Sequence, residues 1–335
     1  MVPPAMAETF TALVAEQADG RTQVKRTQLE EAALPEGEVT VDVAYSSLNY
    51  KDGLALTGRG KVIRKWPMIP GIDLAGRVRS TTGTRFKPGD PVLVTGNGLG
   101  VSWWGGFAQR ARVKESMALP IPEGLDARTS MAIGTAGFTA ALCVLALQDH
   151  GTLKTERELV VTGAAGGVGS IAVALLAALG KKVIASTGRT SEAAYLKKLG
   201  AADLIGRDVL AQKGPPLAPE RWGGGVDTVG GQTLVTLVSQ TAYRGAVAAC
   251  GLAGGSDFPG TVFPFILRNV ALLGCDSDMT PLEERRRAWK LLVDHLGKLH
   301  LDEVTQEVAL SQLVEHAPRI VDGQVRGRVV VNVNA

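Results

Sequence analysis

The sequence is short of the residues that bind zinc. It holds three cysteines and four histidines in 335 residues, and residues 1–142 contain neither type. The histidines show no ligand spacing, and three scattered cysteines cannot form a four-cysteine structural site. Zinc prefers a tetrahedral set of sulfur and nitrogen donors, so no metal site is expected and metal-assisted alcohol oxidation is disfavoured. The histidines are His150, His295, His300 and His316.

The sequence also lacks long apolar runs and a secretion signal. Apolar stretches such as Ala172–Leu179 and Val270–Leu273 are far shorter than the roughly 20 residues that cross a bilayer. Met1–Phe10 has no basic segment followed by an apolar run. We therefore expect no transmembrane helix, a cytoplasmic protein, and reduced, buried thiols of structural kind at Cys143, Cys250 and Cys275.

The net charge of the sequence is also small. The chain has 36 basic and 33 acidic residues and a net charge of +3, and it has no basic stripe interleaved with aromatics, so nucleic acid is not an expected partner. A hydrophobic content of 45% with 21% charged residues excludes general disorder. The length favours two globular domains.

Short β-rich runs interrupted by glycine and proline fill the first third of the chain. They predict a compact β-barrel-like domain over residues 1–126. Another β-rich run, Val329–Val333, ends the chain, so we expect residues 300–335 to return to that domain. The runs of the first third are Val39–Ala44, Leu74–Val78, Pro91–Val94 and Phe107–Val113.

Helical and strand patterns alternate from Ala127 onward. The alternation predicts a doubly wound parallel sheet, an α/β domain over residues 127–299. The segment Gly214–Gly225, rich in glycine and proline, is expected to be a long surface loop. The expected strands are Leu159–Thr162, Lys182–Ser186, Asp203–Ile205, Val226–Val229, Gly245–Ala249 and Val270–Cys275, and the helices are Ala127–Gln148, Val168–Leu179, Glu192–Leu199, Gln232–Gln240 and Pro281–Leu296.

A glycine-rich turn follows the first of these strands. Gly166 would let the backbone approach a pyrophosphate, and Gly169 would let helix and strand pack closely. The N-terminus of the helix adds free N–H groups and the positive end of its dipole. The turn, which contains Ala165, Gly166, Gly167, Val168 and Gly169, therefore predicts a dinucleotide site, although Ala164 stands where the usual fingerprint begins with glycine.

The end of the next strand indicates which dinucleotide binds. An NAD-binding unit normally carries an acidic residue there, whereas this chain reads Ser186, Thr187, Gly188, Arg189. A carboxylate would repel a 2′-phosphate, but hydroxyls and a guanidinium can hydrogen-bond it. NADPH is therefore the predicted cofactor. An exposed helix-cap charge is the structural alternative for Arg189.

Several further stretches together resemble the medium-chain dehydrogenase/reductase superfamily, and within it the zinc-independent acryloyl-CoA reductase and quinone oxidoreductase group. The resemblance runs over nearly the whole chain. It implies a GroES-like catalytic domain, a Rossmann domain that binds NADPH, a homodimer built through the Rossmann domains, and Ile72 in place of a zinc-ligand histidine. The stretches are Ser46–Asp52, Pro67–Gly76, Gly134–Ala140, Thr162–Ser170, Ala249–Gly255 and Pro264–Val270.

The resemblance also implies site residues. It places Asn49 and Tyr50 beside the nicotinamide, where Tyr50 would contact the substrate oxygen or help supply a proton, and Asp52 would orient the loop. A half-buried tyrosine with a satisfied hydroxyl is the alternative. The remaining implied cofactor contacts are Thr139, Arg207, Leu252, Ile266, Ser277 and Arg328; from the residues alone, Leu252 and Ile266 are more often core positions.

Without a metal, addition of hydride to an enoyl thioester is the favoured chemistry, because the charge spreads as an enolate that hydrogen bonds can support. Reduction of acryloyl-CoA to propanoyl-CoA is the leading prediction. A cluster of Lys61, Arg64 and Lys65 would meet the phosphates of coenzyme A, or would be a solvated loop. A quinone or free enone is the alternative acceptor, and an NADPH-binding protein without turnover is the alternative of another class.

Overall fold

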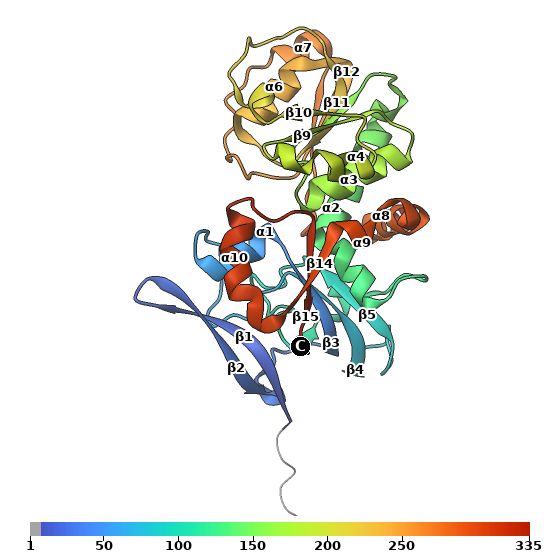
Figure 1. Ribbon diagram of the computed structural model, residues 1–335. Helices are drawn as coiled ribbons and strands as arrows, with labels where there is room; N and C mark the ends of the chain where they lie inside the picture. Colours follow the sequence, from blue (N-terminus) through green and yellow to red (C-terminus); the bar gives the residue numbers. More distant parts are fainter. Residues whose placement is uncertain (1–7) are drawn as a thin grey trace, which may run out of the picture. The chain divides into compact units, whose positions relative to one another are not determined.

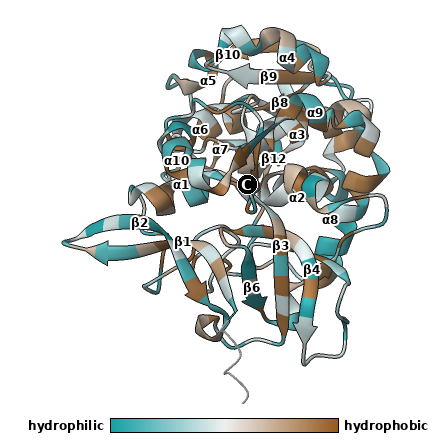
Figure 2. Cartoon of the chain, turned by 60° about the horizontal axis from the view of Figure 1, so that its bottom comes forward, coloured by the Kyte–Doolittle hydropathy of each residue, from teal (hydrophilic) through white to brown (hydrophobic). Residues whose placement is uncertain are grey.

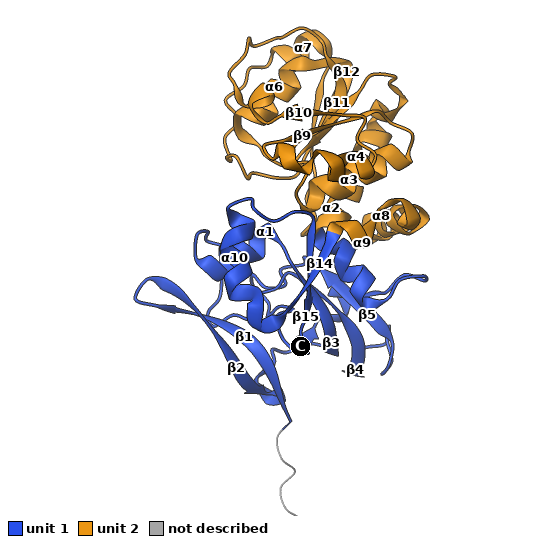
Figure 3. Ribbon diagram, viewed as in Figure 1, with its two compact units in different colours: residues 1–135, 305–335 blue, residues 136–304 orange. Residues whose placement is uncertain are grey.

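The computed structural model describes residues 8–335, which form two compact units (Figures 1 and 3). Unit 1 ends at Thr135 and resumes from Thr305 to Ala335, and unit 2 is Ala136–Val304. The changes of unit therefore lie at 135/136 and 304/305 instead of the expected 126/127 and 299/300. Helix α2 (Ala127–His150) begins at the expected boundary and crosses the observed one, and it breaks only at Gly134, whose φ of 51° and ψ of −163° are not helical.

Unit 1 is built on a seven-stranded sheet of order β14-β15-β3-β4-β5-β7, with β6 also paired to β3. The C-terminal strand β15 lies antiparallel to β3 and parallel to β14, so the end of the chain completes the sheet. The strands are β3 (Val39–Leu48), β4 (Asp73–Thr81), β5 (Pro91–Thr95), β6 (Arg110–Val113), β7 (Leu119–Pro120), β14 (Thr305–Ala309) and β15 (Arg328–Asn332).

An antiparallel hairpin of β1 (Thr9–Ala18) and β2 (Arg21–Glu30) covers the core of unit 1. Strand β1 is mostly buried, whereas β2 is mostly hydrophilic (Figure 2). The N–H groups of Leu13 and Ala15 donate to the carbonyls of Phe107 and Met68. The short helices of unit 1 are η1 (Glu31–Ala33), α1 (Tyr50–Thr57), η2 (Glu115–Met117), η6 (Leu310–Gln312) and α10 (Leu313–Val321).

Unit 2 is a six-stranded sheet of order β10-β9-β8-β11-β12-β13 in which every pair is parallel. This is the Rossmann order, which reverses direction between β8 and β11. The predicted fold class is confirmed. The strands are β8 (Leu159–Val161), β9 (Val183–Thr187), β10 (Asp203–Gly206), β11 (Trp222–Asp227), β12 (Thr241–Ala249) and β13 (Ala271–Gly274).

Helices alternate with these strands, as the periodicity predicted. They are α3 (Gly167–Ala178), α4 (Ala193–Lys198), α5 (Asp208–Ala211), α6 (Gly231–Gln240), α7 (Phe263–Arg268), α8 (Leu282–Asp294) and α9 (Leu301–Val304), with the short turns η3 (Thr152–Lys154), η4 (Thr190–Glu192) and η5 (Leu296–Lys298).

One sequence expectation about a loop needs correction. Residues 222–225 are not loop but begin the buried strand β11. Glycine allows this because a Cβ at Gly225 would lie 2.2 Å from the Val160 carbonyl oxygen. Within residues 8–335, one helix, α2, is long and apolar enough to cross a membrane by length and composition alone. Its apolar stretch is 89% buried within the protein, as in a core helix.

Candidate active site

The glycine turn after β8 is built by backbone contacts. Gly163 has a φ of 58°, and the N–H of Gly166 donates to its carbonyl at 2.9 Å. A Cβ at Gly169 would lie 2.3 Å from that same carbonyl oxygen and 2.7 Å from the Ala164 Cα. Only glycine therefore lets α3 start this close to β8, which is the role that the sequence predicted for Gly169.

The first turn of α3 offers an anion site. Its N-cap is Gly166, which has no side chain to cap the helix, and no acidic residue lies in the first turn. A Cβ at Gly166 would have the Gly163 carbonyl oxygen, at 3.2 Å, as its nearest neighbour, so the backbone is approachable. Free N–H groups and the helix dipole favour phosphate here. Gly166, Gly167 and Val168 are half-buried, and Ala165 and Gly169 are buried.

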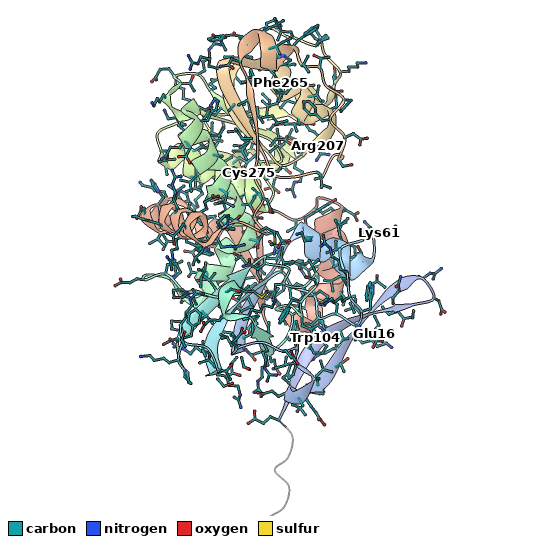
Figure 4. All side chains as sticks on the ribbon, turned by 180° about the vertical axis from the view of Figure 1, so that it is seen from behind. Glu16, Lys61, Trp104, Arg207, Phe265 and Cys275 are labelled. Atoms are coloured by element: carbon teal, nitrogen blue, oxygen red, sulfur yellow. The ribbon has the colours of Figure 1, made fainter. Side chains whose placement is uncertain are left out.

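Two arginines flank the end of β9. Arg189 donates through Nη2 to the Ala165 carbonyl at 3.0 Å, so its guanidinium lies at the glycine turn. A Cβ at Gly188 would lie 2.7 Å from Nε of Arg207, so the Arg207 guanidinium covers Gly188; Arg207 is labelled in Figure 4. The buried Ser186 and Thr187 precede them, and the Arg207 N–H donates to the Thr187 carbonyl. The structure thus gathers the residues predicted to recognise a 2′-phosphate.

The reversal of strand order is fixed by a polar contact that the sequence analysis missed. Thr162 Oγ1 donates to Asp227 Oδ1 at 2.7 Å, and the Thr228 N–H donates to Thr162 Oγ1 at 3.0 Å. The N–H of Gly230 donates to Asp227 Oδ2 at 2.7 Å. Burial raises the pKa of Asp227, and these hydrogen bonds oppose the increase. A carboxylate at the end of the apolar strand β11 is the sequence signal that would have identified it.

The predicted nicotinamide contacts in unit 2 fall into two groups. Thr139 is 5% exposed and lies on α2. Leu252 and Ile266 are 57% and 68% exposed, so the alternative reading of them as core residues is wrong. Ser277 is half-buried in the loop after β13. This loop is held by Arg285, whose Nη2 donates to the carbonyls of Ser277 and Asp278.

Unit 1 contains a buried polar cluster centred on Asp73, a residue that the sequence analysis did not single out. Asp73 is fully buried at the start of β4. Its Oδ2 accepts hydrogen bonds from Asn49 Nδ2 at 2.8 Å and from the Thr135 N–H at 2.9 Å. The hydroxyls of Ser47 and Thr135 donate to the same carboxylate. An acidic residue inside the apolar stretch Pro67–Gly76 was the available signal.

Asp52 and Asn49 begin helix α1 as a capping box. The Asn49 N–H donates to Asp52 Oδ2 at 2.9 Å, and the Ile72 N–H donates to Asp52 Oδ1 at 2.9 Å. Asp52 is 1% exposed, and burial together with the nearby charge of Asp73 raises its pKa to about 7. The carboxyl group therefore fixes the position of the α1 N-terminus relative to β4.

Arg328 supplies the positive charge of the cluster. It is 2% exposed on β15 and donates through Nη1 to Asn49 Oδ1, through Nη2 to Ser47 Oγ and through Nε to the Ala132 carbonyl. Burial lowers the pKa of Arg328, and the charges of Asp73 and Asp52 oppose this. A Cβ at Gly134 would lie 2.6 Å from Arg328 Nη2, so the break in α2 makes room for the guanidinium. Its predicted cofactor contact stays a prediction.

Tyr50 is half-buried as the first residue of α1, next to the cluster in sequence. A metal does not fit beside it. Ile72 stands where the resemblance places a zinc-ligand histidine, and within residues 8–335 no three His, Cys, Asp or Glu side chains are grouped so that they could hold a metal ion.

The basic cluster lies in the loop after α1. Lys61, which is labelled in Figure 4, Arg64 and Lys65 are exposed. The Arg64 N–H donates to the Val101 carbonyl, which anchors the loop. The neighbouring Arg59 instead forms an ion pair with Asp322. The three predicted phosphate contacts are therefore presented to solvent on one loop.

Comparison with known proteins gives consistent results. Residues 35–123 match the alcohol dehydrogenase GroES-like domain, and residues 167–294 match the zinc-binding dehydrogenase family. A protein of Escherichia coli (strain K12) named probable acrylyl-CoA reductase AcuI is 53% identical over 96% of this chain and 99% of its own length. Acrylyl-CoA reductase AcuI of Ruegeria pomeroyi is 49% identical over 97% of this chain and 100% of its own length.

Solved structures extend the similarity to the fold. The crystal structure of E. coli K-12 YHDH with bound NADPH has a TM-score of 0.94 and 53% identity, and the match covers 96% of this chain and 100% of that chain.

Proposed function

The chain belongs to the medium-chain dehydrogenase/reductase superfamily, in its zinc-independent acrylyl-CoA reductase and quinone oxidoreductase group, and from this premise we propose that it reduces acrylyl-CoA to propanoyl-CoA with NADPH. The observation that carries the proposal is the full-length identity of about half to two acrylyl-CoA reductases. The predicted activity and the predicted cofactor agree with it. The quinone alternative is less favoured.

NADPH supplies the hydride when it is bound. The N–H groups at the start of α3 would hold the pyrophosphate, because they are approachable and no carboxylate competes with it in the first turn. Arg189 and Arg207, on either side of Gly188, would bind the 2′-phosphate. This pair of cations would favour NADPH over NADH.

We propose that the unit 1 residues Asn49, Asp52 and Tyr50 do not share one catalytic role. Asn49 is 7% exposed, its Nδ2 donates to Asp73 and its Oδ1 accepts from Arg328, and Asp52 is more deeply buried still. Both are positioning residues that fix the start of α1. Tyr50, which α1 leaves half-buried, would donate a hydrogen bond to the thioester oxygen, where negative charge gathers as hydride adds to the β-carbon.

Lys61, Arg64 and Lys65 are proposed to bind the phosphates of coenzyme A. Two observations support this proposal. The three side chains are exposed on one anchored loop, and the charge of the neighbouring Arg59 is instead paired with Asp322. Charge reversal at Lys61 (Lys61→Glu) should raise the KM for acrylyl-CoA by several-fold, about 1 kcal/mol, and leave the KM for a quinone unchanged. Lys25→Glu on β2, where the lysine pairs with Glu16, is the matched control.

A homodimer through unit 2 is also proposed. Strand β13 is the last strand of its sheet, and Leu272 on it is 37% exposed; helix α7, which precedes β13 in the chain, also carries exposed apolar residues such as Leu267. An uncovered edge strand with apolar neighbours is suited to pairing with a second copy. Leu272→Glu should shift the mass measured by light scattering from dimer to monomer.

The test of the activity is steady-state oxidation of NADPH with acrylyl-CoA, crotonoyl-CoA and a simple quinone. The proposal requires a higher kcat/KM for acrylyl-CoA than for the quinone. A preference for the quinone would favour the second acceptor class. No oxidation with any of them, with NADPH bound in calorimetry, would favour a binding protein without turnover. We place the enzyme in the cytoplasm, in agreement with three free cysteines.

A further inference from the structure

A buried pair of hydroxyl groups lies behind the glycine turn of unit 2. The Tyr195 hydroxyl on α4 donates to Ser170 Oγ on α3 at 2.8 Å, and Ser170 Oγ donates to the Ala164 carbonyl at 3.2 Å. Ser170 is 0% exposed and Tyr195 is 8% exposed. The two hydroxyls therefore form a relay from α4 through α3 to the backbone of the turn (both helices are labelled in Figure 1).

The relay ends on a carbonyl in the middle of the turn. Ala164 follows Gly163, whose φ is 58°, and the Ala164 N–H donates to the Ser186 carbonyl at 3.1 Å. Both backbone polar groups of Ala164 are thus bonded, one to β9 and one to α3. A trans peptide unit is planar, so the direction of the Ala164 carbonyl also sets the direction of the Ala165 N–H, which points the opposite way. The relay therefore fixes how the turn presents its N–H groups.

The next carbonyl of the turn is held from the same segment of the chain. Arg189 directly precedes η4 and donates through Nη2 to the Ala165 carbonyl at 3.0 Å. Tyr195 lies in α4, which follows η4, and reaches the Ala164 carbonyl through Ser170. The segment that carries the predicted 2′-phosphate contact is therefore joined to the turn at both of its ends.

The hydroxyls are not needed to keep α4 in place. Leu196 and Leu199 at this helix are buried, and a Cβ at Gly200 would lie 2.5 Å from the Ala177 Cβ on α3. A phenylalanine at position 195 would keep the packing of the ring and avoid the cost of burying a hydroxyl. What the buried hydroxyls add is a fixed direction for one backbone carbonyl, because a hydrogen bond is directional and apolar packing is not.

We propose that Tyr195 is a positioning residue for the dinucleotide. Through Ser170 it fixes the Ala164 carbonyl and so directs the N–H groups of the turn towards the pyrophosphate. The pyrophosphate is common to NADPH and NADH, so the relay acts on both cofactors, whereas Arg189 acts on the 2′-phosphate alone. This role rests on the proposed function, in which the glycine turn binds the cofactor.

The first test is Tyr195→Phe, which removes one oxygen and keeps the ring. We expect the Kd values for NADPH and NADH in calorimetry to rise by the same factor, about three- to ten-fold. The kcat at saturating NADPH should stay unchanged, because the relay acts on binding of the pyrophosphate and not on the nicotinamide. Tyr243→Phe is the matched control, since this tyrosine of unit 2 is 63% exposed on β12, and it should change neither Kd.

The second test breaks the relay at its middle. Ser170→Ala should raise both Kd values as Tyr195→Phe does, and the double variant should bind no more weakly than Ser170→Ala, because the two hydroxyls act in series. Ser239→Ala separates positioning from a general loss of stability. It removes another buried serine hydroxyl of unit 2, which donates to the Thr236 carbonyl at 2.9 Å on α6. It should lower the melting temperature as Ser170→Ala does and leave both Kd values unchanged.

The outcomes distinguish this role from the proposed function. No binding of NADPH to the wild-type chain would overturn both, whereas weaker binding by Gly169→Ala beside an unchanged Kd in Tyr195→Phe would overturn the positioning role alone. An increase confined to NADPH, additive effects in the double variant, or equal weakening in Ser239→Ala would also overturn it. If Ser170→Ala does not fold, as judged by its melting curve, Tyr195→Phe and Tyr243→Phe decide the question.

Discussion

The two units differ in whether their polar and charged groups are accessible or buried. In unit 2, backbone N–H groups are left accessible, because the first turn of α3 is capped by Gly166, which has no side chain. Arg189 and Arg207 lie at the end of the neighbouring strand. Unit 1 instead buries its charges. Asp52, Asp73 and Arg328 are each 2% exposed or less, and hydrogen bonds connect them through Ser47 and Asn49.

From this difference we infer which groups bind the ligand and which groups hold the backbone in position. Open N–H groups at a helix N-terminus and exposed cations are free of the desolvation that burial imposes, so they suit the capture of a phosphate from water. Buried, fully bonded charges suit the fixing of a backbone, because moving any one of them leaves another charge without compensation. The pairs of substitutions below test this division of roles, from the largest expected effect to the smallest.

Asp73→Asn should give the largest loss of stability in unit 1. The amide that replaces the second carboxylate oxygen cannot accept all of the bonds from Ser47, Asn49 and Thr135, and Arg328 loses its compensating charge. Removal of one partner of a buried pair costs about 3–5 kcal/mol. Chemical denaturation gives the free energy of unfolding. Asp42→Asn, whose carboxylate is 49% exposed beside Arg79, should cost less than about 1 kcal/mol. Equal losses for the two variants would show that burial is not decisive.

Asp52 should make stability depend on pH. Its pKa is about 7 in the folded chain against 3.8 for an ordinary aspartate, so the folded state holds the proton more tightly. The stabilisation is therefore complete below about pH 4 and is lost as the pH rises to about 7, by up to about 4 kcal/mol. Asp52→Asn cannot titrate and should remove this fall, although its absolute stability is lower. Unfolding free energies across that pH range measure the slope; parallel slopes for wild type and variant would contradict the assignment.

Gly169→Ala should disrupt the nucleotide site of unit 2. The added Cβ would lie 2.3 Å from the Gly163 carbonyl oxygen, so α3 must move away from β8. Overpacking of this kind costs about 1–3 kcal/mol, and we expect the Kd for NADPH to rise by about 10- to 100-fold in calorimetry. Gly214→Ala in the same unit, where a Cβ meets nothing within 4 Å, is the control. An unchanged Kd for Gly169→Ala would show that the turn does not bind the cofactor.

The same comparison explains what could be predicted from the sequence. The residues proposed to bind NADPH in unit 2 lie in two short segments, the turn from Gly163 to Gly169 and the strand end from Ser186 to Arg189, so periodicity and local residue types were sufficient to single them out, and their contacts with the cofactor stay a prediction. The strand alternation likewise predicted the order of elements. The β11 start was missed because three glycines resemble a loop, although close strand contacts require them.

The unit 1 cluster could not be predicted in this way. Its members come from β3, the start of α1, β4, the break in α2 and β15, and each is polar or charged within an apolar surrounding. Only the pairing of β15 with β3 and of β4 with β3 brings Arg328 and Asp73 to the same side chains. Resemblance identified Asn49 and Asp52, but the carboxylate that holds them, Asp73, followed from the tertiary structure alone.

Arg189→Ala should give the smallest but most specific effect. The guanidinium lies at the glycine turn, where it would form charge-assisted bonds with a 2′-phosphate that NADH does not have. We expect the KM for NADPH to rise by about ten-fold and the KM for NADH to change little. Arg189 also donates to the Ala165 carbonyl, so a small common effect on both cofactors is expected, and the ratio of the two KM values is the decisive measurement. Arg157→Ala, which removes an exposed arginine near the opposite end of β8, should leave the ratio unchanged. Equal increases for both cofactors in Arg189→Ala would assign the arginine to the structure of the turn instead of to phosphate recognition.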